Sequence, residues 1–127
     1  MKRILLIGEN EDLLRSRAAL LAKYHANIVM STPTDLVSAV GDLPFDVVVL
    51  CHSLTGTTAE SVAIGARKRW QNTRILQLVR YDFEKSESLH HADAVASSER
   101  PDEVVDAVRG AFERQRKPAK RWMTARR

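Results

Sequence analysis

The chain has 127 residues, a length that suits one domain with a single hydrophobic core. Its hydrophobic fraction of 44% and charged fraction of 28% are typical of a soluble globular protein. The single cysteine excludes an internal disulfide and a zinc site built on several thiolates. The first apolar run, Ile4–Ile7, is too short for a signal-peptide core or a membrane span, so we expect a cytoplasmic protein that does not enter the membrane.

The net charge of +4 combines two unlike parts of the chain. Residues 1–113 carry 13 Lys and Arg against 16 Asp and Glu, a balance of −3, whereas residues 114–127 carry seven basic residues and no acidic one. The basic character therefore belongs to the tail and does not by itself indicate a nucleic-acid-binding domain. We predict one domain over residues 1–116, followed by a basic, flexible tail over residues 117–127.

The first half of the chain alternates short apolar runs with helical patterns. Arg3–Ile7 is predicted to be a strand, and a helix follows from Asn10 or Glu11. The apolar residues of that helix recur at three- and four-residue spacings and form one stripe: Leu13, Leu14, Ala18, Leu21 and Ala22. Asn27–Met30 is predicted to be a second strand.

A second helix is expected after Ser31 or Thr32, either of which can cap it. Pro33 occupies a favourable first position, and Gly41 ends the helix. Its inward-facing residues are predicted to be Leu36, Val37 and Val40.

The second half of the chain continues the alternation. Asp46–Leu50 is an apolar, β-branched run typical of a strand buried on both faces. After a loop over Ser53–Thr58, a helix is predicted to run to about Trp70, with Val62, Ala63, Ala66 and Trp70 facing inward. The remaining elements are a strand over Arg74–Val79, a short polar helix over Phe83–His90, a strand over Ala92–Ala96 and an amphipathic helix from Pro101 that ends before Lys117-Pro118.

Five strands that alternate with helices predict right-handed crossovers and a parallel sheet covered on both faces. Five such units in this length favour a flavodoxin-like (βα)5 doubly wound fold with strand order 2-1-3-4-5. In such a sheet, ligands bind at the carboxyl ends of the strands. Cys51 follows the third strand directly, and its thiol is therefore the first candidate for chemistry.

The sequence resembles the receiver domain of two-component response regulators over about residues 2–116. The segment 3–15 is similar to the receiver opening, in which a strand delivers two adjacent acidic residues. Asp46–Cys51 resembles the strand that carries the phospho-accepting aspartate, and residues 92–104 match the closing pattern. The resemblance implies the flavodoxin-like fold, a role in signal transduction and phosphoryl transfer supported by Mg²⁺.

The positions that this resemblance assigns to chemistry carry other residues here. The first acidic position is Gly8, the second is Glu9, the acceptor position is Cys51, the hydroxyl position is Val79 and the lysine position is Ser97. Only Glu9 keeps a suitable side chain, and one carboxylate beside a thiol is a poor site for a hard cation. With neither metal nor lysine, nothing neutralises an incoming phosphoryl group.

These losses predict a degenerate (pseudo-receiver) domain without enzymatic activity or cofactor, in which Mg²⁺ binding is lost or weak. The resemblance implies a protein partner, which is a histidine kinase, another regulator or a second copy of the chain. The partner is expected on the face made by the fourth helix, the fifth strand and the fifth helix. A scaffold that binds a kinase without accepting phosphate fits the sequence equally well.

Three further features have alternative interpretations. Cys51 can be a packed residue, or the centre of a redox sensor or a thiol or phosphocysteine enzyme; Thr57 stands where a cysteine-based phosphatase has its arginine. His90-His91 can be interpreted as a metal-binding pair or as part of an exposed turn, and we favour the turn because adjacent histidines do not share a face of a regular element. The tail with Trp122 and Met123 is a solvated extension, a docking peptide or a weak contact for anionic partners over residues 114–127.

Overall fold

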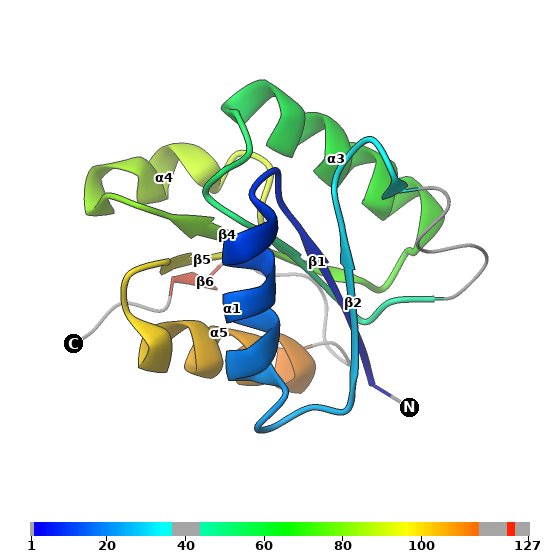
Figure 1. The fold of residues 1–127 in the computed structure, drawn as a ribbon. Helices are drawn as coiled ribbons and strands as arrows, with labels where there is room; N and C mark the ends of the chain where they lie inside the picture. Colours follow the sequence, from blue (N-terminus) through cyan, green and yellow to red (C-terminus); the bar gives the residue numbers. More distant parts are fainter. Residues whose placement is uncertain (1, 37–43, 115–121, 124–127) are drawn as a thin grey trace.

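The structure, a computed structural model, describes residues 2–36, 44–114 and 122–123 (Figure 1). Strands and helices alternate along the chain, as the sequence predicts. In order they are β1 (Arg3–Ile7), α1 (Glu11–Leu21), β2 (Asn27–Ser31), β3 (Val47–Leu50), α3 (Gly56–Arg69), β4 (Arg74–Val79), the 3-10 helix η1 (Asp82–Glu84), α4 (Lys85–Ser88), β5 (Ala94–Ser97), α5 (Pro101–Arg114) and β6 (Trp122–Met123).

The described strands form one parallel sheet in the order β2-β1-β3-β4-β5-β6. The predicted flavodoxin-like order 2-1-3-4-5 is therefore confirmed. Figure 1 shows α1 and α5 on one face of the sheet and α3 and α4 on the other. The sixth strand, which the sequence did not predict, pairs Trp122 with Ala94 and Met123 with Val95 at the outer edge of β5.

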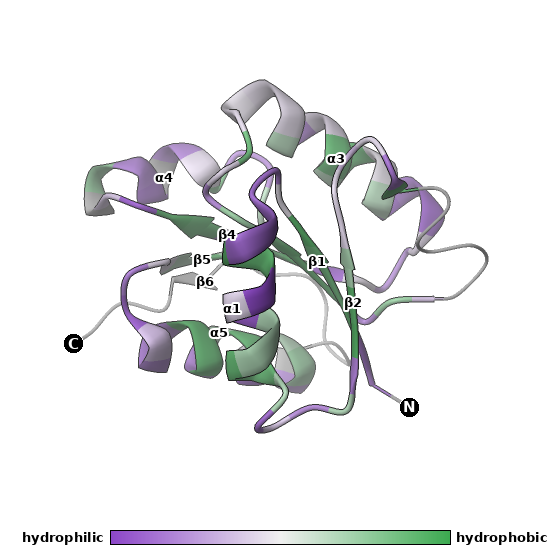
Figure 2. Ribbon diagram, viewed as in Figure 1, coloured by the Kyte–Doolittle hydropathy of each residue, from purple (hydrophilic) through white to green (hydrophobic). Residues whose placement is uncertain are grey.

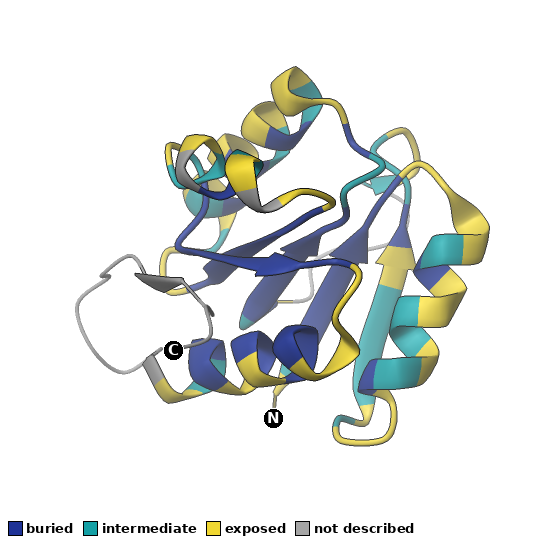
Figure 3. Ribbon diagram, turned by 90° about the vertical axis from the view of Figure 1, so that its left-hand side faces the viewer, coloured by how far each residue is buried: buried dark blue, intermediate teal, exposed yellow. Residues whose placement is uncertain are grey.

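The sheet separates two hydrophobic clusters, because successive side chains of a strand point to opposite faces. Leu6, Val49 and Leu76 belong to the cluster beneath α1 and α5, whereas Val48 and Ile75 belong to the cluster beneath α3. Every residue of β3 is fully buried. The central strands are apolar in Figure 2 and buried in Figure 3, in which β2 is only partly covered. The unbroken apolar run of β3 follows from this burial on both faces.

Side-chain caps fix where two of the helices begin. Asn10 accepts a hydrogen bond from the Leu13 N–H at 3.1 Å, so α1 begins at Glu11 as predicted. Thr55 accepts one from the Thr58 N–H at 3.2 Å, and α3 therefore begins at Gly56, inside the segment that we predicted as a loop. The prediction for Ala22 was wrong, because this residue ends α1 and is exposed.

Two other helical predictions have different outcomes. Most of the helix predicted after Ser31 or Thr32 falls on residues 37–43, which lie outside the described residues. The polar segment Phe83–His90 contains η1 and the four residues of α4, which confirms a short helix there. Among the described residues, no helix is long and apolar enough to cross a membrane.

We predict that Leu76→Ala lowers the free energy of unfolding by about 2–5 kcal/mol, because Leu76 is fully buried in the cluster beneath α5. The exposed Ile64 on α3 supplies the control, and Ile64→Ala is expected to change the free energy by no more than about 0.5 kcal/mol. Urea unfolding measures both values. Equal losses in the two variants would contradict the assigned core.

Candidate functional site

The carboxyl ends of β1, β3, β4 and β5 bring the sequence-predicted site residues to one edge of the sheet. Ile7 pairs with Leu50, and the Cys51 N–H donates to the Ile7 carbonyl at 2.9 Å, so Gly8 and Cys51 leave their strands side by side. Val79 and Ser97 are partners in the β4–β5 register. The five positions therefore fall into a β1–β3 group and a β4–β5 group.

The β1–β3 group is closely packed around Gly8, which is buried. A Cβ atom placed on Gly8 would lie 3.0 Å from Ser53 Oγ, 3.1 Å from Cys51 Cβ and 3.3 Å from Leu14 Cδ2. Real Cβ atoms seldom approach their neighbours so closely, and any side chain here would displace them. The close approach of these neighbours therefore favours glycine at this position.

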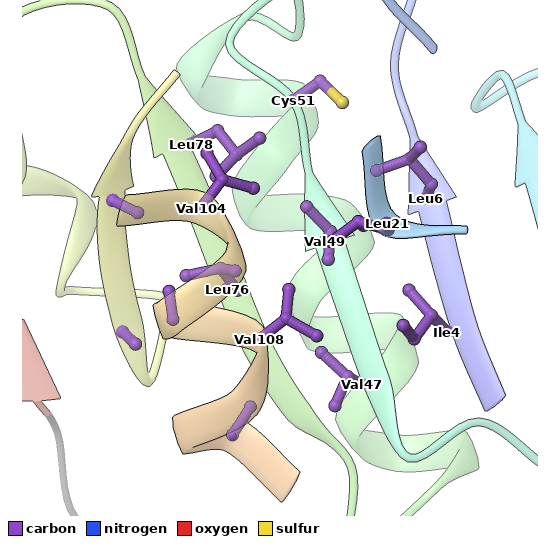
Figure 4. Close-up of a cluster of buried hydrophobic side chains, with 14 of the residues drawn as sticks. Ile4, Leu6, Leu21, Val47, Val49, Cys51, Leu76, Leu78, Val104 and Val108 are labelled. Carbon is purple, nitrogen blue, oxygen red and sulfur yellow. The ribbon is translucent and has the colours of Figure 1, made fainter. Parts of the chain in front are cut away.

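The Cys51 side chain is part of the hydrophobic core and is only 2% exposed. Figure 4 shows its sulfur at one end of the cluster that contains Leu6, Val49 and Leu78. Burial raises the pKa of the thiol to about 12, although the positive charge of Arg17 acts in the opposite direction. The thiol is therefore protonated at neutral pH and is neither a nucleophile nor a metal ligand in this state.

Glu9 is exposed, and its backbone rather than its carboxylate takes part in the packing. Its N–H donates to Ser53 Oγ at 3.0 Å. Ser53 Oγ therefore accepts a hydrogen bond from Glu9 and also lies where a side chain on Gly8 would begin. This arrangement ties the end of β1 to the loop after β3.

A polar bridge that the sequence did not predict crosses the same edge. Arg17 on α1 donates through Nη2 to the Ser98 carbonyl and, at 2.7 Å, to Ser98 Oγ. His52 Nδ1 lies 2.8 Å from the same Ser98 oxygen. Burial lowers the pKa of His52, and Arg17 and Arg80 lower it further. These contacts fit a neutral imidazole whose Nδ1 accepts a hydrogen bond from the Ser98 hydroxyl.

The β4–β5 group is buried as well, since Val79 and Ser97 are each 5% exposed. The Ser97 N–H donates to the Glu103 carboxylate at 2.8 Å, and the Ser98 N–H donates to the Val79 carbonyl. Val79 offers no hydroxyl and Ser97 no charge at these positions. The group links the end of β5 to α5.

The residues at this edge do not fit a magnesium site, which needs several oxygen ligands. Gly8 has no side chain, the Cys51 thiol is protonated, and Glu9 supplies one exposed carboxylate. Over residues 2–36, 44–114 and 122–123, no group of three or more His, Cys, Asp or Glu could hold a metal ion. His91 instead contacts Gln77 Oε1 through Nε2 at 3.0 Å, while His90 is exposed.

A cavity of about 660 Å³ lies beside the candidate site, between α3 and α4. Its lining is largely polar and includes Thr57, Gln77, Tyr81 and His91. The Gln77 side chain is fixed by the sheet, because its amide N–H groups donate to the backbone carbonyls of Leu50 and Leu78. His52 lines the cavity as well and contacts Ser98 Oγ through Nδ1.

Comparison with known proteins identifies the architecture. No protein-family model matches the chain, and neither does any curated protein sequence. Among solved structures, the response regulator TrrA from Thermotoga maritima, in complex with Mg²⁺–BeF, matches with a TM-score of 0.73 and 23% identity, over 87% of this chain and 99% of TrrA. The fold is that of a response-regulator receiver domain.

Two further structures agree with this fold. A receiver domain from Clostridium thermocellum matches with a TM-score of 0.75 and 13% identity, over 91% of this chain and 98% of that one. A complex of the histidine kinase ThkA with TrrA matches with a TM-score of 0.72 and 21% identity, over 88% and 99% of the two chains. The chain thus spans nearly the whole of these receiver domains.

We predict that iodoacetamide alkylates Cys51 of the folded chain at pH 7.5 at least about a hundredfold more slowly than it alkylates the urea-unfolded chain, because the thiol is buried and protonated. The rate is followed by mass spectrometry against pH. A fast native reaction with a midpoint near neutral pH would contradict the buried thiol and would support a reactive cysteine.

Proposed function

We propose that this chain is an atypical receiver domain that acts in signal transduction as a protein-interaction module, without phosphorylation of an aspartate. The observation that carries the proposal is the packing of Gly8 against Cys51, Ser53 and Leu14. In this interpretation the five positions Gly8, Glu9, Cys51, Val79 and Ser97 form a degenerate acceptor pocket whose space is filled by the protein itself.

The chemistry of phosphoryl transfer supports this proposal. Catalysis of that reaction consists almost entirely of positioning the phosphoryl group and neutralising its charge. Here the acceptor position holds a protonated thiol and the metal ligands are reduced to Glu9. Arg17 is a cation near this edge, but its guanidinium is bound to Ser98. We therefore propose that the chain is not an enzyme and needs no cofactor.

The proposed binding surface is the face formed by α4, β5 and α5, on which β6 pairs with the outer edge of β5. The aromatic residues Tyr81 and Phe83 directly precede α4 in the chain and are 51% and 80% exposed. Their rings stack in parallel with centroids 5.5 Å apart, and the Arg80 guanidinium lies 5.7 Å from the Tyr81 ring centroid. Exposed aromatic and arginine side chains are enriched at protein interfaces.

The proposed partner is a protein: a histidine kinase, another regulator or a second copy of the chain. TrrA has been seen in complex with a histidine kinase, and the likeness in fold makes a kinase a reasonable partner to test. The basic segment 114–127 is proposed to add a weak contact with anionic partners. We place this activity in the cytoplasm, where such signalling proteins meet their kinases.

A thiol-based function of Cys51, as a redox sensor or a phosphocysteine enzyme, is the weaker candidate. Both activities need an accessible thiol whose pKa is lowered by a neighbouring cation or histidine. Cys51 is 2% exposed and its pKa is raised to about 12. His52, the adjacent histidine, bonds to Ser98.

We predict that Mg²⁺ with beryllofluoride leaves the amide resonances of Gly8, Cys51 and Ser97 unchanged in heteronuclear NMR spectra, because this edge lacks metal ligands and an acceptor carboxylate. TrrA, which binds Mg²⁺–BeF, serves as the positive control. Acetyl phosphate is expected to leave the mass of the chain unchanged. Saturable shifts at these three residues would overturn the proposed function.

A further inference from the structure

A buried ion pair joins α4 to α5 on the proposed binding face. Lys85 Nζ lies 3.0 Å from Glu103 Oε1, and the two side chains are 10% and 7% exposed. Buried Lys and Glu are rare unless they are paired, because both charges must give up their hydration. Because burying these two charges is costly, we ask what the Lys85–Glu103 pair does for the structure.

The Glu103 carboxylate contacts three separate segments of the chain. One oxygen, Oε1, accepts hydrogen bonds from Lys85 on α4 and, at 2.8 Å, from the Ser97 N–H at the end of β5. The other, Oε2, lies 3.4 Å from Arg100 Nη1, just before α5. Glu103 also occupies the first turn of α5, where the helix dipole favours a negative charge. The carboxylate is thus fixed from several directions.

The sequence of α4 supplies polar side chains only. It consists of the four residues Lys85–Ser88, of sequence Lys-Ser-Glu-Ser, and so contributes no apolar side chain to the core. In globular proteins, a helix usually gains most of its stability by packing an apolar face against the core rather than from its intrinsic helix propensity. Phe83, in the preceding η1, is directed to solvent, with 80% of its surface exposed.

From these contacts we infer that Glu103 is the positioning residue of the α4–β5–α5 face. Through Lys85 it sets where α4 and the adjoining Tyr81–Phe83 pair lie, and through the Ser97 N–H it ties them to the edge that carries the candidate site. Its importance for binding rests on the proposed function. In this inference the Lys85–Glu103 ion pair, which is always present, links the candidate site to the binding face, and no bound ligand is needed for that link.

The test compares amide hydrogen exchange of the full chain in the wild type and in Glu103→Gln. The reporters are the N–H groups of Leu89 and Ala92, which donate to the carbonyls of Lys85 and Ser88 and so follow α4 directly. In Glu103→Gln the charge is lost, and we expect both reporters to exchange at least about tenfold faster. The Cys51 N–H, bonded to Ile7, monitors the central sheet and is expected to keep its rate.

Asp106→Asn is the matched control, because Asp106 lies on the same helix but its side chain is 58% exposed, in an ion pair with Arg109. Asp106→Asn is expected to leave the exchange rates of all the reporter N–H groups unchanged. If Glu103→Gln does not fold, Lys85→Met decides, since it keeps the bond from Ser97 to Glu103 while removing the cation. Lys85→Arg, which keeps a donor and a charge, is expected to restore most of the protection.

Unchanged exchange of Leu89 and Ala92 in folded Glu103→Gln, or in Lys85→Met where Glu103→Gln does not fold, would overturn the inference. Faster exchange that affects the Cys51 N–H equally would overturn it too, because Glu103 would then stabilise the whole domain rather than α4. Neither result involves a partner, so the proposed interaction role would stand. Conversely, a response to beryllofluoride would remove the proposed function and leave the exchange result intact.

Discussion

The close approach of β1 and β3 at their carboxyl ends is the constraint on which the packing of the candidate site depends. The two strands pair in register up to Ile7 and Leu50, and the chain then places Gly8 directly against Cys51. Ser53 closes the remaining side through its contacts with Gly8 and with the Glu9 N–H. A carboxylate side chain at position 8 would require Ser53, Cys51 or Leu14 to shift, because its Cβ atom would lie 3.0–3.3 Å from them.

The protein's own groups make the connections across this edge of the sheet. Ser98 joins α1 and the loop after β3, because Arg17 and His52 both contact its hydroxyl. Glu103 joins β5, α4 and α5. These contacts span the strand ends on which a receiver fold places its ligands. These contacts are the physical basis for the proposal that the domain binds a partner without being switched by phosphorylation.

The sequence predicted the features that depend on neighbouring residues. The bounds of β1 and β4 and the start of α1 followed from apolar runs and from the cap at Asn10, which are local signals. The Arg17–Ser98 contact joins residues 81 apart, and the β5–β6 pairing depends on an open sheet edge, so neither leaves a local pattern. The resemblance to receiver domains places Gly8 at an acidic position, but only the structure shows that a side chain there would press against Ser53 and Leu14.

The most direct test of a packed edge is urea unfolding of Cys51→Asp with and without Mg²⁺, with Cys51→Ser as the control for the lost sulfur. If the edge is packed, a carboxylate placed among core residues is costly, and the aspartate variant is less stable than the serine variant by at least about 1 kcal/mol. Mg²⁺ is then expected to restore none of that loss. An aspartate variant that is as stable as the wild type, and that Mg²⁺ stabilises further, would show an open acceptor site and contradict the tight packing around Cys51.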